Sequence, residues 1–319
     1  MSRWGLTVPL SGIPLAEQAD IVRALPDLGY TDLWSSETNG ADAFTPLALA
    51  AAWEPTLRLG TAIVPVFTRG PALIAMSAAA LADAAPGRFV LGLGASSPVI
   101  VSGWNSVPFE EPYRRSRDVL RAVRTALAGE RVDGQFDTFT ITRFTLAPAP
   151  AVPPRIVLAG LRSQMLRLAG READGAILNW LAATDVAQCV AAVDNPAAEI
   201  VARIFVCPTA NADVARHVGR MAICSYLTVP AYAAFHEWLG RGDALRPMQE
   251  AWAAGDRKAA LAAVPDEVVD ELVLHGSPES CREQVQAYAD AGVGTPVIAL
   301  LPTDTGPVTL DLLRALGRS

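Results

Sequence analysis

The residues best able to do chemistry stand where apolar runs of this chain end. Glu37 follows the run that ends in Trp34-Ser35-Ser36, and a carboxylate at the end of a buried strand can orient or protonate a bound ligand. Glu37 could equally cap a helix or pair with an arginine, and its position alone supports both interpretations. Asp42 lies in the same loop and could take its place.

Three other runs end in residues suited to holding a ligand. Residues 88–94 lead directly into Ala95-Ser96-Ser97, which leaves backbone amides and hydroxyls uncovered by bulky side chains. Ala159-Gly160-Leu161-Arg162-Ser163 runs straight into a helical pattern, which predicts either an anion site or an ordinary tight turn. Asn179 and Trp180 place an amide beside a flat aromatic surface.

Other common chemistries find little support in the sequence. We place the three histidines, His217, His236 and His275, in helices and away from strand ends, so we expect neither a metal site nor a Ser-His-Asp hydrolase. The chain has no Gly-x-Ser-x-Gly and no phosphate-binding Gly-x-x-x-x-Gly-Lys-Ser/Thr. With no metal and few acids and bases, the site is predicted to hold a cofactor that performs the chemistry.

The elements that carry these residues repeat as strand and helix. Helices are expected to begin at Pro46, Pro71 and Pro278, and glycines precede the following strands. Eight such units predict an α/β fold, a (β/α)8 TIM barrel, in preference to an open doubly wound sheet. The expected strands lie near 5–10, 31–36, 58–66, 88–94, 155–160, 175–181, 201–207 and 295–301.

Two connections are longer than a minimal unit needs. Residues 95–154 are predicted to hold one helix over 114–128 and a hairpin that turns at Asp133-Gly134. Residues 209–276 are predicted to be an all-helical insertion between strands seven and eight. Pro65 predicts a bulge or distorted peptide in the third strand. We interpret 1–319 as one domain.

Composition narrows the partners. The net charge is −7 with no basic stripe, so we expect neither nucleic acid nor a membrane surface as a partner, but a small-molecule substrate. No stretch has the length of a membrane span, and the start lacks a signal-peptide pattern. The four widely spaced cysteines are expected to be free thiols, which favours a cytoplasmic location.

Beyond these patterns, three segments resemble the luciferase-like monooxygenase superfamily, and more narrowly its branch that uses the deazaflavin coenzyme F420. They are Leu91-Gly92-Leu93-Gly94-Ala95 with Gly103-Trp104-Asn105, then 154–175, then Gly276-Ser277-Pro278-Glu279 with 288–293. The resemblance implies a (β/α)8 barrel with a deazaflavin, or alternatively FMN, over the strand ends. It also implies a homodimer.

The resemblance carries specific site residues. It places a non-prolyl cis peptide at Ala62–Ile63 and the acidic, catalytic residue at Glu37. The implied cofactor-binding residues are Thr61, Ala62, Ile63, Val64, Ala95, Ser96, Ser97, Ala159, Gly160, Leu161, Asn179 and Trp180.

Two departures from the family bear on the substrate. Thr38 stands where the sugar-phosphate dehydrogenases of this branch have a histidine, and Lys258 is the only lysine, so a sugar phosphate is disfavoured. The aromatic residues Trp180, Tyr226, Tyr232 and Trp238 favour an apolar, aromatic substrate over a charged one. We therefore expect hydride transfer between F420 and an organic substrate. An FMN-dependent monooxygenase and a barrel that binds its cofactor without catalysis remain alternatives.

Overall fold

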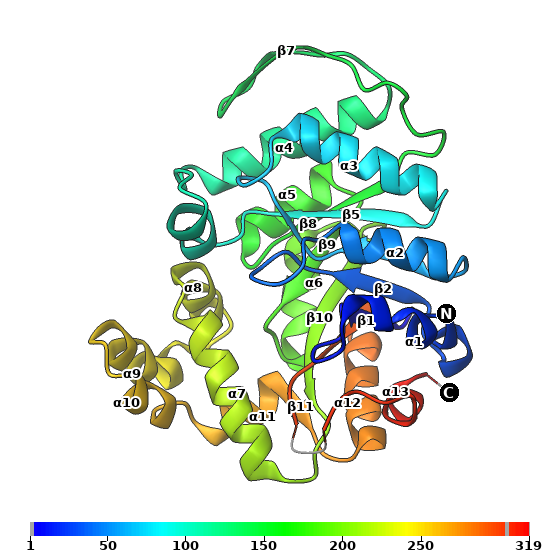
Figure 1. The fold of residues 1–319 in the computed structure, drawn as a ribbon. Coiled ribbons are helices and arrows are strands. Elements are labelled where there is room, and N and C mark those ends of the chain that lie inside the picture. Colours follow the sequence, from blue (N-terminus) through cyan, green and yellow to red (C-terminus); the bar gives the residue numbers. More distant parts are fainter. Residues whose placement is uncertain (1–2, 304–305, 319) are drawn as a thin grey trace.

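A closed parallel barrel forms the centre of the computed structural model, which describes residues 3–303 and 306–318 (Figure 1). Neighbouring strands pair in parallel, and β12 pairs with both β10 and β1, which closes the ring. The predicted (β/α)8 barrel is thereby confirmed. Its strands are β1 (Gly5–Val8), β2 (Asp32–Ser35), β3 (Arg58–Thr61) continued by β4 (Val64–Pro65), β5 (Phe89–Gly94), β8 (Arg155–Ala159), β9 (Gly175–Asn179), β10 (Glu199–Cys207) and β12 (Thr295–Leu300).

Trp34 of β2 fills the middle of the barrel interior. A Cβ added to Gly60 of β3 would lie 2.4 Å from the Trp34 ring, so only glycine leaves room for the indole there. Apolar side chains from five further strands complete this layer. They are Val90, Val157, Ile177, Val201 and Val297.

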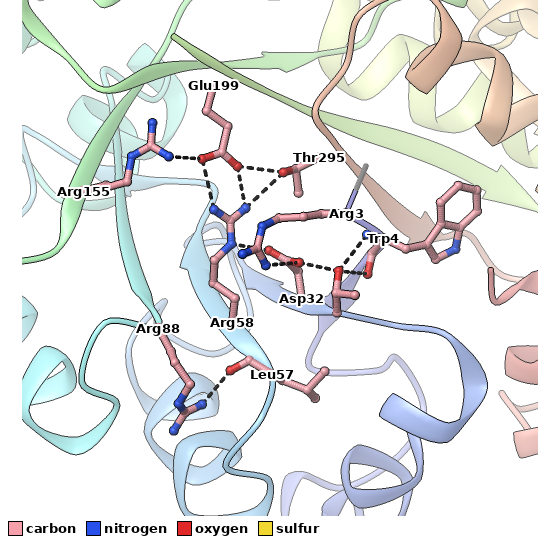
Figure 2. A network of polar contacts seen from close by, with 10 residues as sticks. Arg3, Trp4, Asp32, Leu57, Arg58, Arg88, Arg155, Glu199 and Thr295 are labelled. Carbon is pink, nitrogen blue, oxygen red and sulfur yellow. Dashed lines mark hydrogen bonds and ion pairs between the residues drawn. The ribbon is translucent and has the colours of Figure 1, made fainter. Parts of the chain in front are cut away.

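The amino-terminal end of the barrel is closed by charged side chains (Figure 2). Arg58 of β3 donates to Asp32 of β2 and to both carboxylate oxygens of Glu199 on β10. Thr295 of β12 donates to Glu199 at 2.7 Å, and Arg155 of β8 donates to the same carboxylate at 3.0 Å. This network joins five barrel strands at the end opposite the predicted site.

Helices surround the barrel and largely follow the predicted boundaries (Figure 1). Proline occupies the first turn of α2, α3 and α12 as expected, and Gly29 adopts φ +86° before β2. The helices outside the insertion are α1 (Ala19–Ala24), α2 (Thr45–Trp53), α3 (Pro71–Ala84), α4 (Pro112–Leu127), α5 (Ser163–Glu172), α6 (Val186–Val193), α12 (Pro278–Asp290) and α13 (Leu310–Leu316). No helix in the described ranges has both the length and the apolarity to cross a membrane.

The long insertion is helical for most of its length but ends in a strand. Its helices are α7 (Ala212–Leu227), α8 (Pro230–Trp238), α9 (Gly242–Ala253), α10 (Arg257–Ala262) and α11 (Asp266–Leu272). The all-helical prediction is wrong for β11 (Val273–His275), which pairs with Phe205–Cys207 of β10. β9 pairs only with Glu199–Arg203, the first part of β10. The last residues of β10 therefore have a backbone edge that can pair with β11.

The predicted hairpin exists, but its turn was misplaced. Its strands are β6 (Val132–Gln135) and β7 (Thr140–Phe144), so Asp133-Gly134 lies inside a strand at a shift in register. The chain turns over 136–139, where Phe136 donates to the Phe139 carbonyl at 2.8 Å. Asp118 of α4 accepts hydrogen bonds from Thr138, and this tertiary contact fixes the turn.

Candidate functional site

The third strand is interrupted at the carboxyl end of the barrel. β3 stops at Thr61, the Ala62–Ile63 peptide is cis as the resemblance implies, and β4 resumes at Val64. The Ala62 amide donates to the Ser35 carbonyl at 2.6 Å, and the Glu37 amide donates to the Ile63 carbonyl at 3.3 Å. The bulge expected from Pro65 is therefore held against the end of β2.

Residues of the bulge meet the ends of β5 and β8. A Cβ added to Gly94 of β5 would lie 3.0 Å from Ile63 Cγ1 and 3.1 Å from the Ala159 Cβ. Ala62, Ile63 and Ala159 also pack against the apolar layer inside the barrel. We call Ala62, Ile63, Gly94 and Ala159 the floor. Ala62, Ile63 and Ala159 are half-buried, whereas most residues of the barrel strands are buried. The floor is therefore partly open to solvent at the carboxyl ends of the strands.

Two predicted anion-binding turns flank the floor. Ser96 adopts φ +64°, and Ala95, Ser96 and Ser97 are half-buried. After β8, the Gly160 amide donates to the Ile177 carbonyl at 3.2 Å, so that amide is already used. The first turn of α5, which begins at Ser163, has no side-chain cap and leaves its amides for a ligand.

Glu37 lies at the end of β2, but it is paired. Its carboxylate accepts two hydrogen bonds from Arg69 Nε, at 3.1 and 3.2 Å, and one from Nη2 at 3.0 Å. It also accepts from the Ala43 amide at 3.1 Å. Pairing with an arginine, one of the two interpretations of Glu37, is thus present in the structure. Any catalytic role would involve the Glu37–Arg69 pair rather than a free acid.

Asp42 does not substitute for Glu37 as a site acid. It accepts hydrogen bonds from the amides of Phe44 and Thr45 at the start of α2. Burial acts to raise the pKa of Asp42, but these hydrogen bonds and the charge of Arg69 hold it below its ordinary value. Asp42 is therefore a helix-capping anion.

Three predicted cofactor residues turn their side chains away from the strand ends. The Thr61 hydroxyl donates to the Gly92 carbonyl and accepts from the Gly92 amide, so it ties β3 to β5. Val64 lies in the main core. Trp180 is 1 % exposed, and its ring stacks on Phe205 with 4.0 Å between centroids, so the expected open stacking surface is covered.

Sequence reasoning missed Arg203 in β10, on the opposite side of the barrel from the bulge. In β10 it lies level with Asn179 of β9 and Val297 of β12, and Val297 belongs to the barrel interior. Residues level with each other in parallel strands share a face, so Arg203 points inward. A charged residue inside the apolar run 200–207 is the signal that could have revealed it.

Asn179 is oriented by the insertion. Its Nδ2 donates to the Tyr232 hydroxyl of α8 at 2.8 Å, while its Oδ1 is buried with no partner among the described residues. Tyr226 of α7 packs edge-on against Tyr232 and also contacts Trp180. The helices of the insertion thus supply aromatic side chains to the strand ends, which we call the aromatic wall, whereas Trp238 packs against Phe235.

His217 lies in α7 and His236 in α8 as predicted, but His275 does not lie in a helix. His275 ends β11, so the prediction that no histidine stands at a strand end is wrong; its Nε2 lies 3.0 Å from Asp270. His236 is fully buried in α8, where desolvation and the charge of Arg241 lower its pKa to about 4. Within 3–303 and 306–318 no three metal-ligating side chains cluster.

A basic cleft lies on the outside of the barrel near these turns. It has a volume of about 520 Å³ and lies between the start of α4, with Glu111 just before it, and most of the length of α5. Arg114, Arg167 and Arg171 line it together with Gln164, which is one residue beyond the start of α5. We call it the arginine cleft.

These features fit a flavin or a deazaflavin. The floor has no side chain at position 94, where a Cβ would lie 3.0 Å from Ile63 and 3.1 Å from Ala159, and this leaves room for a ring. The sequence as a whole points the same way, because the model of the family described as luciferase-like monooxygenase matches residues 3–295. The chain belongs to this family.

Individual relatives extend the comparison. A Mycobacterium tuberculosis protein, named provisionally as a coenzyme F420-dependent oxidoreductase, is 26% identical over 89% of this chain and 91% of its own. The coenzyme F420-dependent tetrahydromethanopterin reductase of Methanopyrus kandleri shares the fold at a TM-score of 0.79 and 18% identity, over 99% of this chain and 97% of that chain. The oxygenating constituent of a Pseudomonas putida 3,6-diketocamphane monooxygenase, solved with FMN, matches at 0.63 and 18% identity, over 94% and 93% of the two chains.

Proposed function

We propose that this protein is a coenzyme F420-dependent oxidoreductase that transfers a hydride between C5 of the deazaflavin and an apolar organic substrate. The floor carries the proposal, because it gives a planar ring a surface formed by small side chains and a glycine. The names of the mycobacterial relative and of the methanogen reductase support F420 as the cofactor.

In this proposal the chain's own residues bind and orient. Ala62, Ile63 and Ala159 support the ring, and the backbone around Ser96 and Ser97 with the first turn of α5 holds the anionic tail. The bound deazaflavin supplies the hydride chemistry. The Glu37–Arg69 pair, at the end of β2, orients the substrate.

Water is kept from the reacting atoms by the aromatic wall. Trp180 and Phe205 are both buried, and Tyr226 packs over them with ring centroids at 5.2 and 6.1 Å. Excluding water strengthens every polar interaction at the site and favours hydride transfer over side reactions. The same wall favours a substrate with an apolar body.

An FMN-dependent monooxygenase is the second candidate. It is favoured by the family description and by the FMN-containing Pseudomonas relative. The two candidates differ in the cofactor bound and in the need for oxygen.

Fluorescence titration of the purified protein with F420 and, separately, with FMN tests the proposal. Gly94→Val would fill the floor and is expected to weaken cofactor binding about tenfold or more, since each 1.4 kcal/mol of lost contact is tenfold. Gly70→Val is the matched control, because a Cβ there meets nothing within 4 Å. Preference for FMN would favour the monooxygenase, and binding of neither cofactor would refute a cofactor-holding site.

We further propose one luciferase-like domain over 1–319 that acts as a cytoplasmic homodimer. The insertion shares its core with the barrel, since Phe235 of α8 lies in the main hydrophobic cluster. Leu73 and Met76, three residues apart on α3, are about half exposed and offer an apolar face for a second copy. Light scattering of Met76→Lys against the wild type tests the dimer, and a wild-type monomer would refute it.

A further inference from the structure

Arg203 is a positive charge inside the barrel with no negative partner. Within residues 3–303 and 306–318 it makes no ion pair, and its Nε is buried with no hydrogen-bond partner. Its guanidinium lies over the Phe205 ring, whose centroid is 4.9 Å from Cζ. Such a contact offsets only part of the cost of desolvating a charge.

Arg203 as a whole is half-buried, and two fully buried arginines of the chain show what pairing looks like here. Arg58 contacts Asp32 and Glu199, and Arg241 contacts Asp185 and Glu271. A guanidinium left unpaired in an apolar barrel destabilises the folded protein, so its presence calls for a ligand that supplies the missing charge or acceptor.

The neighbours of Arg203 describe that ligand. Asn179 stands level with it on β9 and fixes the Tyr232 oxygen by donating to it. Tyr232 is close enough for the charge of Arg203 to act on its ionisation, but burial raises the pKa of Tyr232 to about 12. The phenol is therefore neutral at physiological pH, and its own O–H can donate.

Two donors thus converge on one place at the strand ends, surrounded by aromatic rings. We propose that Arg203 and Tyr232 bind an anionic oxygen, a carboxylate or enolate, of a substrate whose remainder is apolar. Asn179 is the positioning residue that aims Tyr232. This inference deepens the proposed function by naming the substrate class, and it rests on the strand ends being the substrate site.

Arg203 stands across the barrel from the bulge. Floor residues come from the bulge after β3, from β5 and from β8, whereas Arg203 comes from β10, on the opposite side of the ring of strands from β3. Asn179 comes from β9, next to β8, and Tyr232 from the insertion. A ring held at the bulge would therefore leave Arg203, on the opposite strand, available to a substrate. That arrangement assigns the Arg203 wall to the substrate rather than to the cofactor.

Calorimetric titration with benzoate, and with benzamide as its neutral counterpart, tests the proposal on protein with and without F420. We expect benzoate to bind in the millimolar range and benzamide more weakly. Arg203→Met should weaken benzoate about tenfold or more, the effect of losing a charge-assisted hydrogen bond, and Arg203→Lys should restore part of the affinity. Arg23→Met, at an exposed pair on α1, is the matched control.

Stability separates a binding role from a structural one. Because Arg203 has no ion pair to lose, Arg203→Met should melt at the wild-type temperature or above it. Equal benzoate affinity in Arg203→Met and the wild type, or no benzoate binding up to about 50 mM, would overturn the proposal. So would a tenfold loss of F420 affinity in Arg203→Met, which would assign the residue to the cofactor. Failure of F420 to bind the wild type refutes the proposed function instead, and the cofactor-free titration still decides the role of Arg203.

Discussion

Replacing Arg58 with methionine tests the network that closes the amino-terminal end of the barrel (Figure 2). Arg58 contacts both Asp32 and Glu199, and it is only 9 % exposed in its side chain. Breaking a buried ion pair costs about 3–5 kcal/mol. In Arg58→Met, Asp32 would still pair with Arg3 and Glu199 with Arg155. We therefore expect the loss in the free energy of unfolding to lie at the lower end of this range, about 3 kcal/mol.

Urea unfolding followed by tryptophan fluorescence measures this loss. With a slope of about 3 kcal/mol per molar urea, the midpoint should fall by about 1 M. Arg58→Lys is the matched control, because it keeps the charge but loses the bidentate contact with Glu199, and it should cost less. Midpoints that agree within about 0.2 M between Arg58→Met and the wild type would refute the reasoning.

The effect should also depend on pH in a defined direction. Burial acts to raise the pKa of Glu199, but the hydrogen bonds and charge of Arg58 hold it below its ordinary value. A carboxylate with a lowered folded pKa contributes stability that is full above its unfolded pKa of about 4.3 and is lost as pH falls through the folded pKa. The difference between wild type and Arg58→Met should therefore be constant near neutrality and shrink below about pH 4. A difference that grows on acidification would contradict this assignment.

Three further predictions concern packing, the cofactor tail and the thiols. Gly92→Ala should abolish soluble expression or lower the melting temperature strongly, because its Cβ would lie 1.8 Å from the Thr61 carbonyl oxygen; wild-type melting would contradict this packing. Arg167→Ala with Arg171→Ala in the arginine cleft should weaken F420 binding and make it less sensitive to salt; an unchanged salt slope in fluorescence titrations would separate the cleft from the anionic tail. The four cysteines are buried, and burial raises the pKa of Cys189 and Cys281 to about 12, so a colorimetric thiol reagent should label them only after denaturation; rapid labelling of the native protein would show that these thiols are accessible.

The sequence by itself determined the architecture. Eight apolar runs, with proline at helix starts and glycine before strands, are local signals, and each strand appeared where its run predicted it. The interruption of the third strand was also readable, since Pro65 cannot donate to the ladder. These features depend on the backbone conformations and hydrogen bonds that each residue type favours, and neighbouring residues in the sequence determine them.

Tertiary structure decided which of the candidate residues face the site. Thr61 and Trp180 both stand at strand ends in the sequence. In the structure, however, the Thr61 hydroxyl donates to the Gly92 carbonyl of the neighbouring strand, and the Trp180 ring is covered by Phe205. Glu37 forms an ion pair with Arg69, which lies thirty-two residues away in the sequence, and no local pattern specifies that pair. Such contacts join segments that are distant in sequence, so local patterns cannot determine them.

Arg203 also shows which properties of a residue are visible in the sequence and which depend on the fold. Its charge within an apolar run is visible in the sequence, but its meaning depends on which partners the fold brings to it. Only the closure of β10 between β9 and β12 turns the guanidinium inward and away from every carboxylate in the described chain. The sequence thus determined the barrel, and the packing of its strands and insertion decided where a charge was left for a ligand.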